Sequence, residues 1–133
     1  MNEEIFWSGI AGSVPFVAVA QPNVPVVPVT LFVNKAAIAN DVHGQLTWGG
    51  AQAGVAAGVG LAHQASLFDG DIDSLVLIVA VWVNPTADNE EEVFSNNRDA
   101  TVAALKQARE AGPDWNKALA AMTSPSNPYF RTN

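Results

Sequence analysis

The 133-residue sequence predicts a single domain of the α/β (α+β) class, with helices packed against one sheet. Three observations support this prediction. Residues 24–33 are rich in Val and Pro, and residues 29–33 among them predict a strand. Residues 75–83 form the longest apolar run, again of strand length. Between them, residues 44–68 are dense in Ala and Gly and place apolar side chains at helical spacing.

The N-terminal half predicts strands that lead into a helix. Residues 14–20 form a strand, and residues 21–23 form a turn because they contain Pro and Asn. Pro25 and Pro28 suit an extended or edge segment before the strand at 29–33. The glycines of 44–68 lower helix propensity, so we expect them to allow close approach to a sheet or to another subunit.

The C-terminal half predicts one long helix and one short helix. The apolar run at 75–83 follows a turn and predicts a central strand covered on both faces. A helix is predicted from Asp88 to about Ala111, broken near residues 95–97 and stopped by Gly112 and Pro113. Asp114 is expected to cap a last short helix, and the tail from 124 to 133 to lie over the surface.

Composition excludes several classes of function. The net charge of −7 argues against nucleic-acid binding, which depends on clustered Lys and Arg. No apolar run approaches the length of a membrane span, so no membrane association is expected. The chain has no cysteine and therefore neither disulfides nor thiolate metal sites. Its acidic start does not resemble a secretion signal, so the expected location is cytoplasmic.

Candidate functional residues are few when only residue types are considered. Lys35 is the single basic residue before Arg98, and composition alone favours a solvated strand end over a partner for it. His43 and His63 lack carboxylates at ligand spacing, so we interpret them as structural or surface histidines and expect no metal. Asp71 and Asp73 are interpreted as a solvated turn, and the acidic run at 90–92 as the start of a helix.

Several short motifs, in order and at matching separations, resemble the formaldehyde-activating enzyme family. Lys35 follows Asn23 by twelve residues, and Gln52 follows Lys35 by seventeen. The motifs are Pro22-Asn23 after the first strand, Phe32-Val33-Asn34-Lys35, Trp48-Gly49-Gly50-Ala51-Gln52, the strand starting at Asp73-Ser74-Leu75, the helix from Ala100-Thr101 to Lys106, and Ser126-Asn127-Pro128-Tyr129-Phe130. The likeness covers residues 14–133, which we take as the domain, and leaves residues 1–13 as a divergent segment.

The resemblance implies a fold of the ribosomal-protein-S5-domain-2 type, a split βαβ arrangement, assembled as a pentamer. It also implies a reaction, the condensation of formaldehyde with tetrahydromethanopterin to the methylene derivative and water. The amine attacks the carbonyl, the carbinolamine loses its hydroxyl and the ring closes. Since hydroxide is a poor leaving group, a general acid assists this step most. In the family that acid is a histidine, followed two residues later by an aspartate, on an N-terminal strand.

Several positions of this chain match or depart from the family's site. Residues 1–13 contain neither histidine nor aspartate, so the acid is absent and the chain resembles a truncated member. The pterin-contacting leucine of the family falls on Val17, and a threonine falls on Ala37, which lacks the hydroxyl. Lys35 and Gln52 are kept. They are either a cation and an amide that reach into a pterin-sized cleft, or residues inherited only for their packing in the fold. The resemblance therefore implies a substrate-binding set of Val17, Lys35, Ala37 and Gln52, with Asn84 replacing a family histidine.

Two functions remain open. The first is an enzyme of the family, a hydro-lyase type of carbon–nitrogen lyase in one-carbon metabolism, impaired because the general acid is missing. The second is a non-catalytic relative that binds a pterin or another metabolite, or a structural subunit. Neither needs a tightly bound cofactor; tetrahydromethanopterin or another pterin is the expected co-substrate. We expect a homo-oligomer, a pentamer or an assembly with a full-length paralogue, with residues 44–68 close to a subunit contact.

Overall fold

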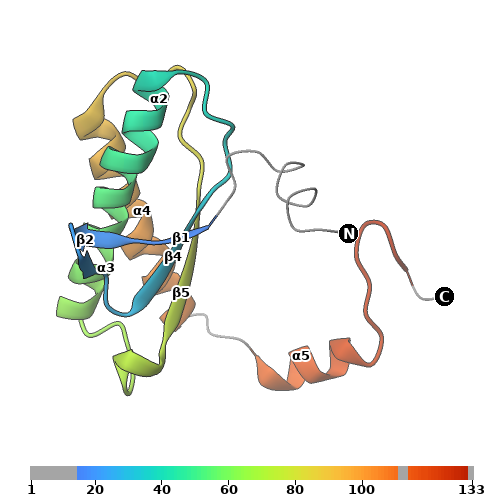
Figure 1. The fold of residues 1–133 in the computed structure, drawn as a ribbon. Coiled ribbons are helices and arrows are strands. Elements are labelled where there is room, and N and C mark those ends of the chain that lie inside the picture. Colours follow the sequence, from blue (N-terminus) through green and yellow to red (C-terminus); the bar gives the residue numbers. More distant parts are fainter. Residues whose placement is uncertain (1–14, 111–113, 132–133) are drawn as a thin grey trace.

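The structure is a computed structural model that describes residues 15–110 and 114–131 (Figure 1). The divergent segment 1–13 and the predicted helix stop at Gly112 and Pro113 therefore lie outside the described residues. The described part mixes helices with short strands, so the predicted α+β class is confirmed. No helix in these residues is long and apolar enough to cross a membrane.

A three-stranded sheet has β4 (Val29–Asn34) at its centre. β1 (Phe16–Val17) pairs with β4 antiparallel, and β5 (Val76–Val81) pairs with it parallel. The prediction of a central strand at 75–83 is wrong, because β5 is an edge strand of this sheet in the described residues. Its apolar residues are also not covered on both faces, because the helices lie on one side of the sheet only (Figure 1).

A second, two-stranded sheet pairs β2 (Val19–Gln21) with β3 (Val24–Pro25). The single strand predicted at 14–20 is thus divided at Ala18, and the helices face two small sheets rather than one. Ala18 is buried, donates its N–H to the Thr30 carbonyl at 2.8 Å and accepts from the Val26 N–H at 3.0 Å. The predicted turn is confirmed, with Asn23 in the left-handed region at φ 65°.

The Ala/Gly-rich region is one continuous helical rod. It comprises α2 (Asp41–Gln45), a π-helical stretch η1 (Leu46–Ala51) and α3 (Gln52–Gln64). Gly54 and Gly58 face α4 (Glu90–Glu110), and a Cβ at Gly58 would lie 2.7 Å from the Arg98 carbonyl oxygen. The partner that needs these two glycines is therefore a helix of the same chain, whereas we expected a sheet or another subunit.

The core lies between the sheet and the α3–α4 layer. Phe32 of β4 is fully buried, stacks on Phe16 with ring centroids 4.9 Å apart, and packs beside Trp48. The edge of Trp48 meets Phe16 at 5.5 Å. Val55 and Val59 of α3 complete this cluster from the helical side. The even-numbered residues of β4 therefore face the core, and its odd-numbered residues face the other way.

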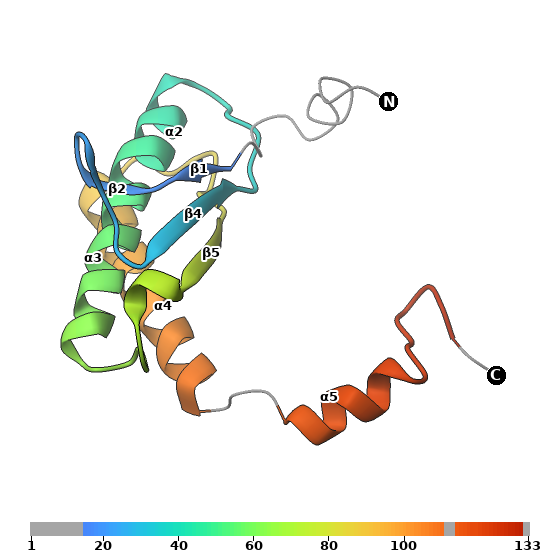
Figure 2. The same cartoon turned by 60° about the horizontal axis from the view of Figure 1, so that its bottom comes forward.

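The C-terminal helices differ from the prediction in one respect. α4 is unbroken, because Asn97 donates its side-chain amide to the Val93 carbonyl at 2.8 Å within the helix and so does not interrupt it. A 3-10 turn, η2 (Ile72–Ser74), precedes β5. The short last helix is confirmed as α5 (Trp115–Met122), capped by Asp114, which accepts from the Lys117 N–H at 3.1 Å. In two views α5 extends away from the sheet and its helices (Figures 1 and 2).

Candidate functional site

Lys35 lies at the carboxyl end of the parallel β4–β5 pair. It follows β4 directly, and its backbone N–H donates to the Val81 carbonyl at 2.8 Å, so the ladder continues beyond Asn34. Since Asn34 pairs with Val81, Lys35 stands beside Trp82 on the neighbouring strand, about 4.8 Å away in the backbone. Both side chains are exposed on the face opposite the helices. This end of a parallel pair is where α/β folds commonly bind ligands.

Asn34 holds the chain that follows Lys35. Its side chain is fully buried, accepts from the Ala36 N–H at 3.0 Å and donates to the Ala36 carbonyl at 2.7 Å. Both polar atoms of the amide are therefore satisfied inside the protein. The turn fixes the direction in which the chain leaves β4, and so fixes the backbone that carries Lys35. Ala37 follows this turn and is exposed.

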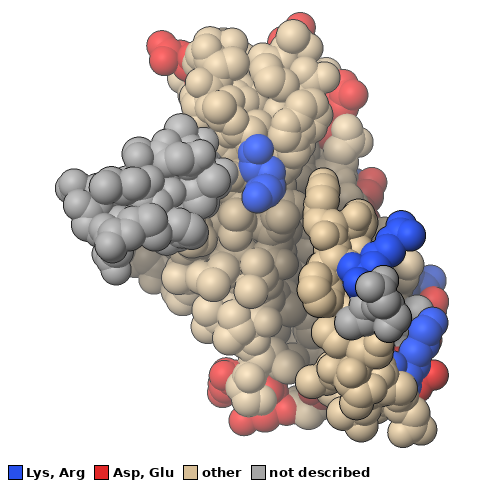
Figure 3. All heavy atoms as spheres, turned by 90° about the vertical axis from the view of Figure 1, so that its right-hand side faces the viewer, with Lys and Arg blue, Asp and Glu red and all other residues tan. Residues whose placement is uncertain are grey.

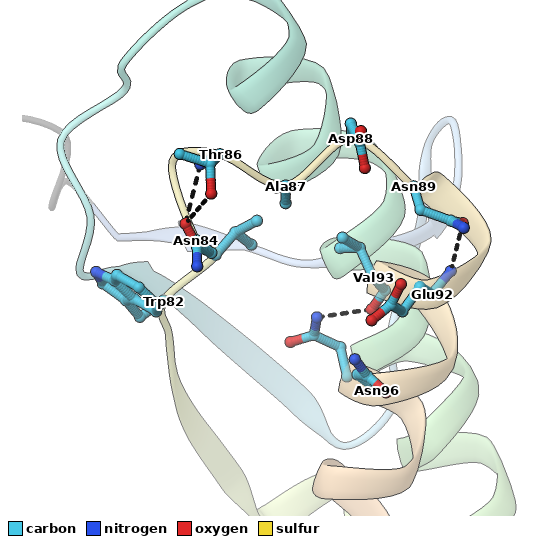
Figure 4. A pocket seen from close by; sticks show the side chains of 11 residues that line it. Trp82, Asn84, Thr86, Ala87, Asp88, Asn89, Glu92, Val93 and Asn96 are labelled. Atoms are coloured by element: carbon cyan, nitrogen blue, oxygen red, sulfur yellow. Dashed lines mark hydrogen bonds between the residues drawn. The ribbon is translucent and has the colours of Figure 1, made fainter.

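A cavity of about 390 Å³ opens beside the end of β5, between the loop after the strand and the first turns of α4 (Figure 4). Asn84 shapes the loop by accepting from both the Thr86 N–H and the Thr86 hydroxyl at 2.9 Å. Figure 4 shows the Trp82 ring on the opposite side of the strand end from Glu92 and Asn96. The lining residues are Trp82, Val83, Asn84, Thr86, Ala87, Asp88, Asn89, Glu92, Val93, Asn96 and Asn97.

The cavity is polar and negatively charged. Asp88 and Glu92 contribute carboxylates, and no lysine or arginine lines it. Asn89 caps α4 by accepting from the Glu92 N–H at 3.0 Å, which leaves its amide nitrogen for other partners. Carboxylate oxygens only accept hydrogen bonds, whereas the carboxamides both donate and accept. The cavity thus suits a ligand that presents N–H or O–H groups. We call Lys35, Trp82 and this cavity the strand-end site.

Gln52 lies on the helical side of the molecule and is tied to the backbone there. Its Oε1 accepts from the Val19 N–H at 3.0 Å, and its Nε2 donates to the Trp48 carbonyl at 2.7 Å. One N–H and one lone pair of the amide remain for another partner. Val17, in contrast, pairs with Leu31 and is exposed on the same face of the sheet as Lys35. None of the cavities described in residues 15–110 and 114–131 is lined by both Lys35 and Gln52, so their shared cleft stays a prediction.

The two histidines of the chain occupy different environments. His43 is 0 % exposed; its Nδ1 accepts from the Ala39 N–H at 3.1 Å, and its Nε2 lies 2.8 Å from the Val83 carbonyl. These partners require Nε2 to carry the proton, and they occupy both ring nitrogens. The interpretation of His43 as structural is confirmed. His63 is exposed in the last turn of α3. No group of three or more metal-ligating side chains occurs in the described residues.

The sequence reasoning missed Trp82 and the acidic cavity. Trp82 continues the alternation of Ile78 and Ala80 along β5, so period-two spacing places all three on one face. Lys35, which follows the adjacent strand β4, lies on the same face of the sheet. The cavity carried no such signal, because Asp88 and Glu92 were explained by the start of a helix.

Comparison with known proteins agrees with the motifs. The sequence model of the formaldehyde-activating enzyme family matches residues 4–130. The 5,6,7,8-tetrahydromethanopterin hydro-lyase of Methanosarcina barkeri is 35 % identical over 123 residues, which are 89 % of this chain and 67 % of that protein. Bifunctional Fae/Hps enzymes of Methanosarcina acetivorans and Methanoculleus marisnigri are each 33 % identical, over 82 % and 77 % of this chain. The matched regions are only 28 % and 26 % of those two enzymes. The chain belongs to the formaldehyde-activating enzyme family.

Proposed function

We propose that the strand-end site binds a reduced pterin of the tetrahydromethanopterin type, and that the chain promotes its condensation with formaldehyde only slowly. Family membership supports the choice of ligand, since a similar protein is named a tetrahydromethanopterin hydro-lyase. One structural observation supports the proposed position of the pterin on the protein. Lys35 and Trp82 stand side by side at the end of the parallel strands, next to an acidic cavity.

The chemistry of the ligand fits these groups. A tetrahydropterin has a planar pyrimidine ring fused to a puckered reduced ring, and the pyrimidine edge donates hydrogen bonds from an amino group and a ring N–H. The carboxylates of Asp88 and Glu92 are matching acceptors inside the cavity. The indole of Trp82 lies on the other side of the strand end, where it offers a flat surface for stacking beside Lys35. Lys35 supplies three donors for a carbonyl or anionic group of the ligand. In this arrangement the residues orient the pterin, and its own amine attacks formaldehyde.

The slow rate follows from the positions of the histidines. Loss of the carbinolamine hydroxyl needs a proton, and general acid catalysis contributes about 10²–10⁴-fold. His43 is buried and both of its ring nitrogens are occupied, so it has no free group to donate that proton. His63 lies on α3, which packs on the side of the sheet away from Lys35. The 133-residue chain contains no other histidine.

Calorimetric titration with tetrahydromethanopterin under anaerobic conditions tests the binding site. We expect the unaltered protein to bind, and Lys35→Gln and Trp82→Ala each to weaken binding about tenfold or more, as the loss of a charged hydrogen bond or a stacked ring implies. Lys106→Gln is the matched control, because Lys106 is an exposed lysine of α4 that lines none of the described cavities. Equal binding by all four proteins would place the pterin elsewhere, and no binding at all would reject the proposal.

A rate measurement tests the second half of the proposal. Formaldehyde consumption, after subtraction of the spontaneous reaction, should be at least about a hundredfold slower than with a hydro-lyase relative assayed in parallel. A comparable rate would mean that another group supplies the proton.

A structural, non-catalytic role is the alternative, and the uncovered sheet face favours it. Val17, Val76 and Ile78 belong to an exposed apolar surface of a kind that soluble proteins usually bury in an assembly. Absence of pterin binding together with a stable oligomer would support this role. The pentamer implied by the family resemblance belongs to the same proposal.

A further inference from the structure

The amine of Lys35 is not held by a carboxylate of the protein. Both ion pairs in the part of the chain that the structure describes are made by arginines, and the exposed Lys35 side chain forms no hydrogen bond there. Figure 3 views the side of the molecule opposite the helices and shows Asp and Glu gathered near its edges. The amine is therefore available to a small molecule that arrives from solvent.

Trp82 gives this amine an aromatic neighbour. Lys35 continues the odd-numbered residues of β4, and Trp82 continues the even-numbered residues of β5, so both side chains leave the sheet on the face away from the helices. Val33 and Ala80 precede them on that face. Trp82 is 60 % exposed, and an indole attracts a cation placed over its ring more strongly than any other side chain. A cation formed at Lys35 thus has an aromatic surface beside it.

A free lysine amine is a nucleophile for an aldehyde. Lysine forms Schiff bases with carbonyl substrates in many enzymes, and the family to which this chain belongs is named for activating formaldehyde, the smallest aldehyde. A protonated lysine nitrogen also leaves carbon more easily than hydroxide does. A route through lysine therefore changes the leaving group at the step in which the acceptor takes up the carbon, where a general acid would otherwise assist most.

We propose that Lys35, beside Trp82, captures formaldehyde covalently and passes its carbon to an amine acceptor. The Lys35 nitrogen attacks the carbonyl carbon, and a proton moves to the oxygen to give a carbinolamine. The hydroxyl leaves with a second proton as water, which forms a methylene iminium ion. The acceptor amine adds to the iminium carbon and loses its proton. The Lys35 nitrogen takes up a proton and leaves, so neither oxidant nor reductant is needed.

The exposure of Lys35 sets the size of this contribution. Nucleophilic lysines are commonly activated by burial in an apolar pocket or by a neighbouring cation. Lys35 has neither, so the covalent route adds modestly to the direct attack of the acceptor on free formaldehyde, in line with a slow condensation. The transfer step rests on the function proposed above, with a reduced pterin as the acceptor. The capture step needs only formaldehyde.

Reductive trapping tests the capture step without a pterin. The folded protein is treated briefly with formaldehyde and cyanoborohydride, which reduces an iminium to a methylamine, and is digested with chymotrypsin. Mass spectrometry then compares Lys35 with the exposed Lys106 and Lys117 in the same sample. Glu110 lies four residues after Lys106, and Asp114 three residues before Lys117, spacings that stabilise an ammonium ion on a helix. We expect methylation of Lys35 to exceed that of the other two several-fold.

Three outcomes of this trapping overturn the proposal. The first is equal methylation of the three lysines in the folded protein. The second is a preference for Lys35 that persists in concentrated urea, since the fold would then not be its cause. The third is an unchanged preference in a Trp82→Ala protein whose circular dichroism matches that of the unaltered chain. Trp82→Phe keeps an aromatic ring and should retain most of the preference.

Lys35→Arg tests the transfer step, because arginine keeps the positive charge but has no primary amine. The catalysed rate of formaldehyde consumption with tetrahydromethanopterin should fall several-fold, while calorimetric affinity for the pterin falls much less than in Lys35→Gln. Lys106→Arg is the matched control, and a rate unchanged by Lys35→Arg would overturn the proposal. Selective methylation of Lys35 without pterin binding would support capture and reject the pterin function. Pterin binding with equal methylation of all lysines would do the reverse.

Discussion

The side-chain Oε1 of Gln52 accepts a hydrogen bond from the backbone N–H of Val19 at 3.0 Å, and so ties the first turn of α3 to β2. The same amide donates to the Trp48 carbonyl at 2.7 Å. A residue chosen as a candidate ligand contact therefore also joins two elements of the fold.

Replacing Gln52 should reduce stability. Gln52→Leu removes both hydrogen bonds and leaves the Val19 N–H without its partner, so we expect a loss of about 1–3 kcal/mol in the free energy of unfolding. Urea denaturation of the mutant and of Gln64→Leu, an exposed glutamine at the end of the same helix, measures the difference. Equal stability of the two mutants, together with weaker pterin binding by Gln52→Leu alone, would instead indicate a role in the ligand site.

The two histidines should respond to mutation very differently. His43→Leu leaves the Ala39 N–H and the Val83 carbonyl without partners, which should destabilise the protein by about 2 kcal/mol or more. His63→Leu at an exposed position should change stability by less than about 0.5 kcal/mol. Thermal unfolding compares them. If His63→Leu lowers the rate of formaldehyde consumption while its stability is unchanged, His63 is the missing acid and the proposed explanation for a slow rate is wrong.

Two glycines of α3 should give effects of opposite sign. Gly58→Ala places a methyl group 2.7 Å from the Arg98 carbonyl oxygen, and the strain should cost about 1–3 kcal/mol. Gly60→Ala meets nothing within 4 Å and should stabilise the helix by up to about 1 kcal/mol. Chemical denaturation of both mutants checks the prediction. Similar effects of the two substitutions would mean that α3 and α4 are not in such close contact.

A carboxylate of the cavity should contribute to pterin affinity. Glu92→Gln keeps the shape of the side chain but removes its charge, so the dissociation constant should rise about tenfold if the carboxylate accepts from the pterin ring. Glu91→Gln is the matched control, because Glu91 is on the same turn of α4 but does not line this cavity. Titration of both mutants decides the point, and equal affinities would remove Glu92 from the site.

The sequence predicted the order of the elements well where local chemistry decides the structure. The Pro22–Asn23 turn and the Asp114 cap depend on neighbouring residues, and both are present. The break at Ala18 depends on hydrogen bonds to Thr30 and Val26, which are remote in sequence and could not be inferred from the strand's composition. The apolar run of β5 was predicted to be a central strand covered on both faces, and this was wrong. A continuous run of apolar residues does not show whether the chain itself covers both faces of the strand.

The candidate site was predicted only in part, for a similar reason. Lys35 lies at a strand end, as its position after the run at 29–33 indicated. That Trp82 stands beside it depends on the parallel register of β4 and β5, which the sequence does not encode locally. The backbone contacts of Gln52 depend on how α3 packs on β2, and resemblance to a family motif gave no information about them.

The π-helical stretch η1 makes one place in this helix tolerant of a change in length. A π-helical turn is wider than an α-helical turn and holds about one more residue for nearly the same total rotation. Deletion of one residue between Leu46 and Ala51 should therefore convert η1 to α-helix and leave Gly54 and Gly58 facing α4. An α-helix turns about 100° per residue, so the same deletion between Gly54 and Gly58 would turn one of them away from α4.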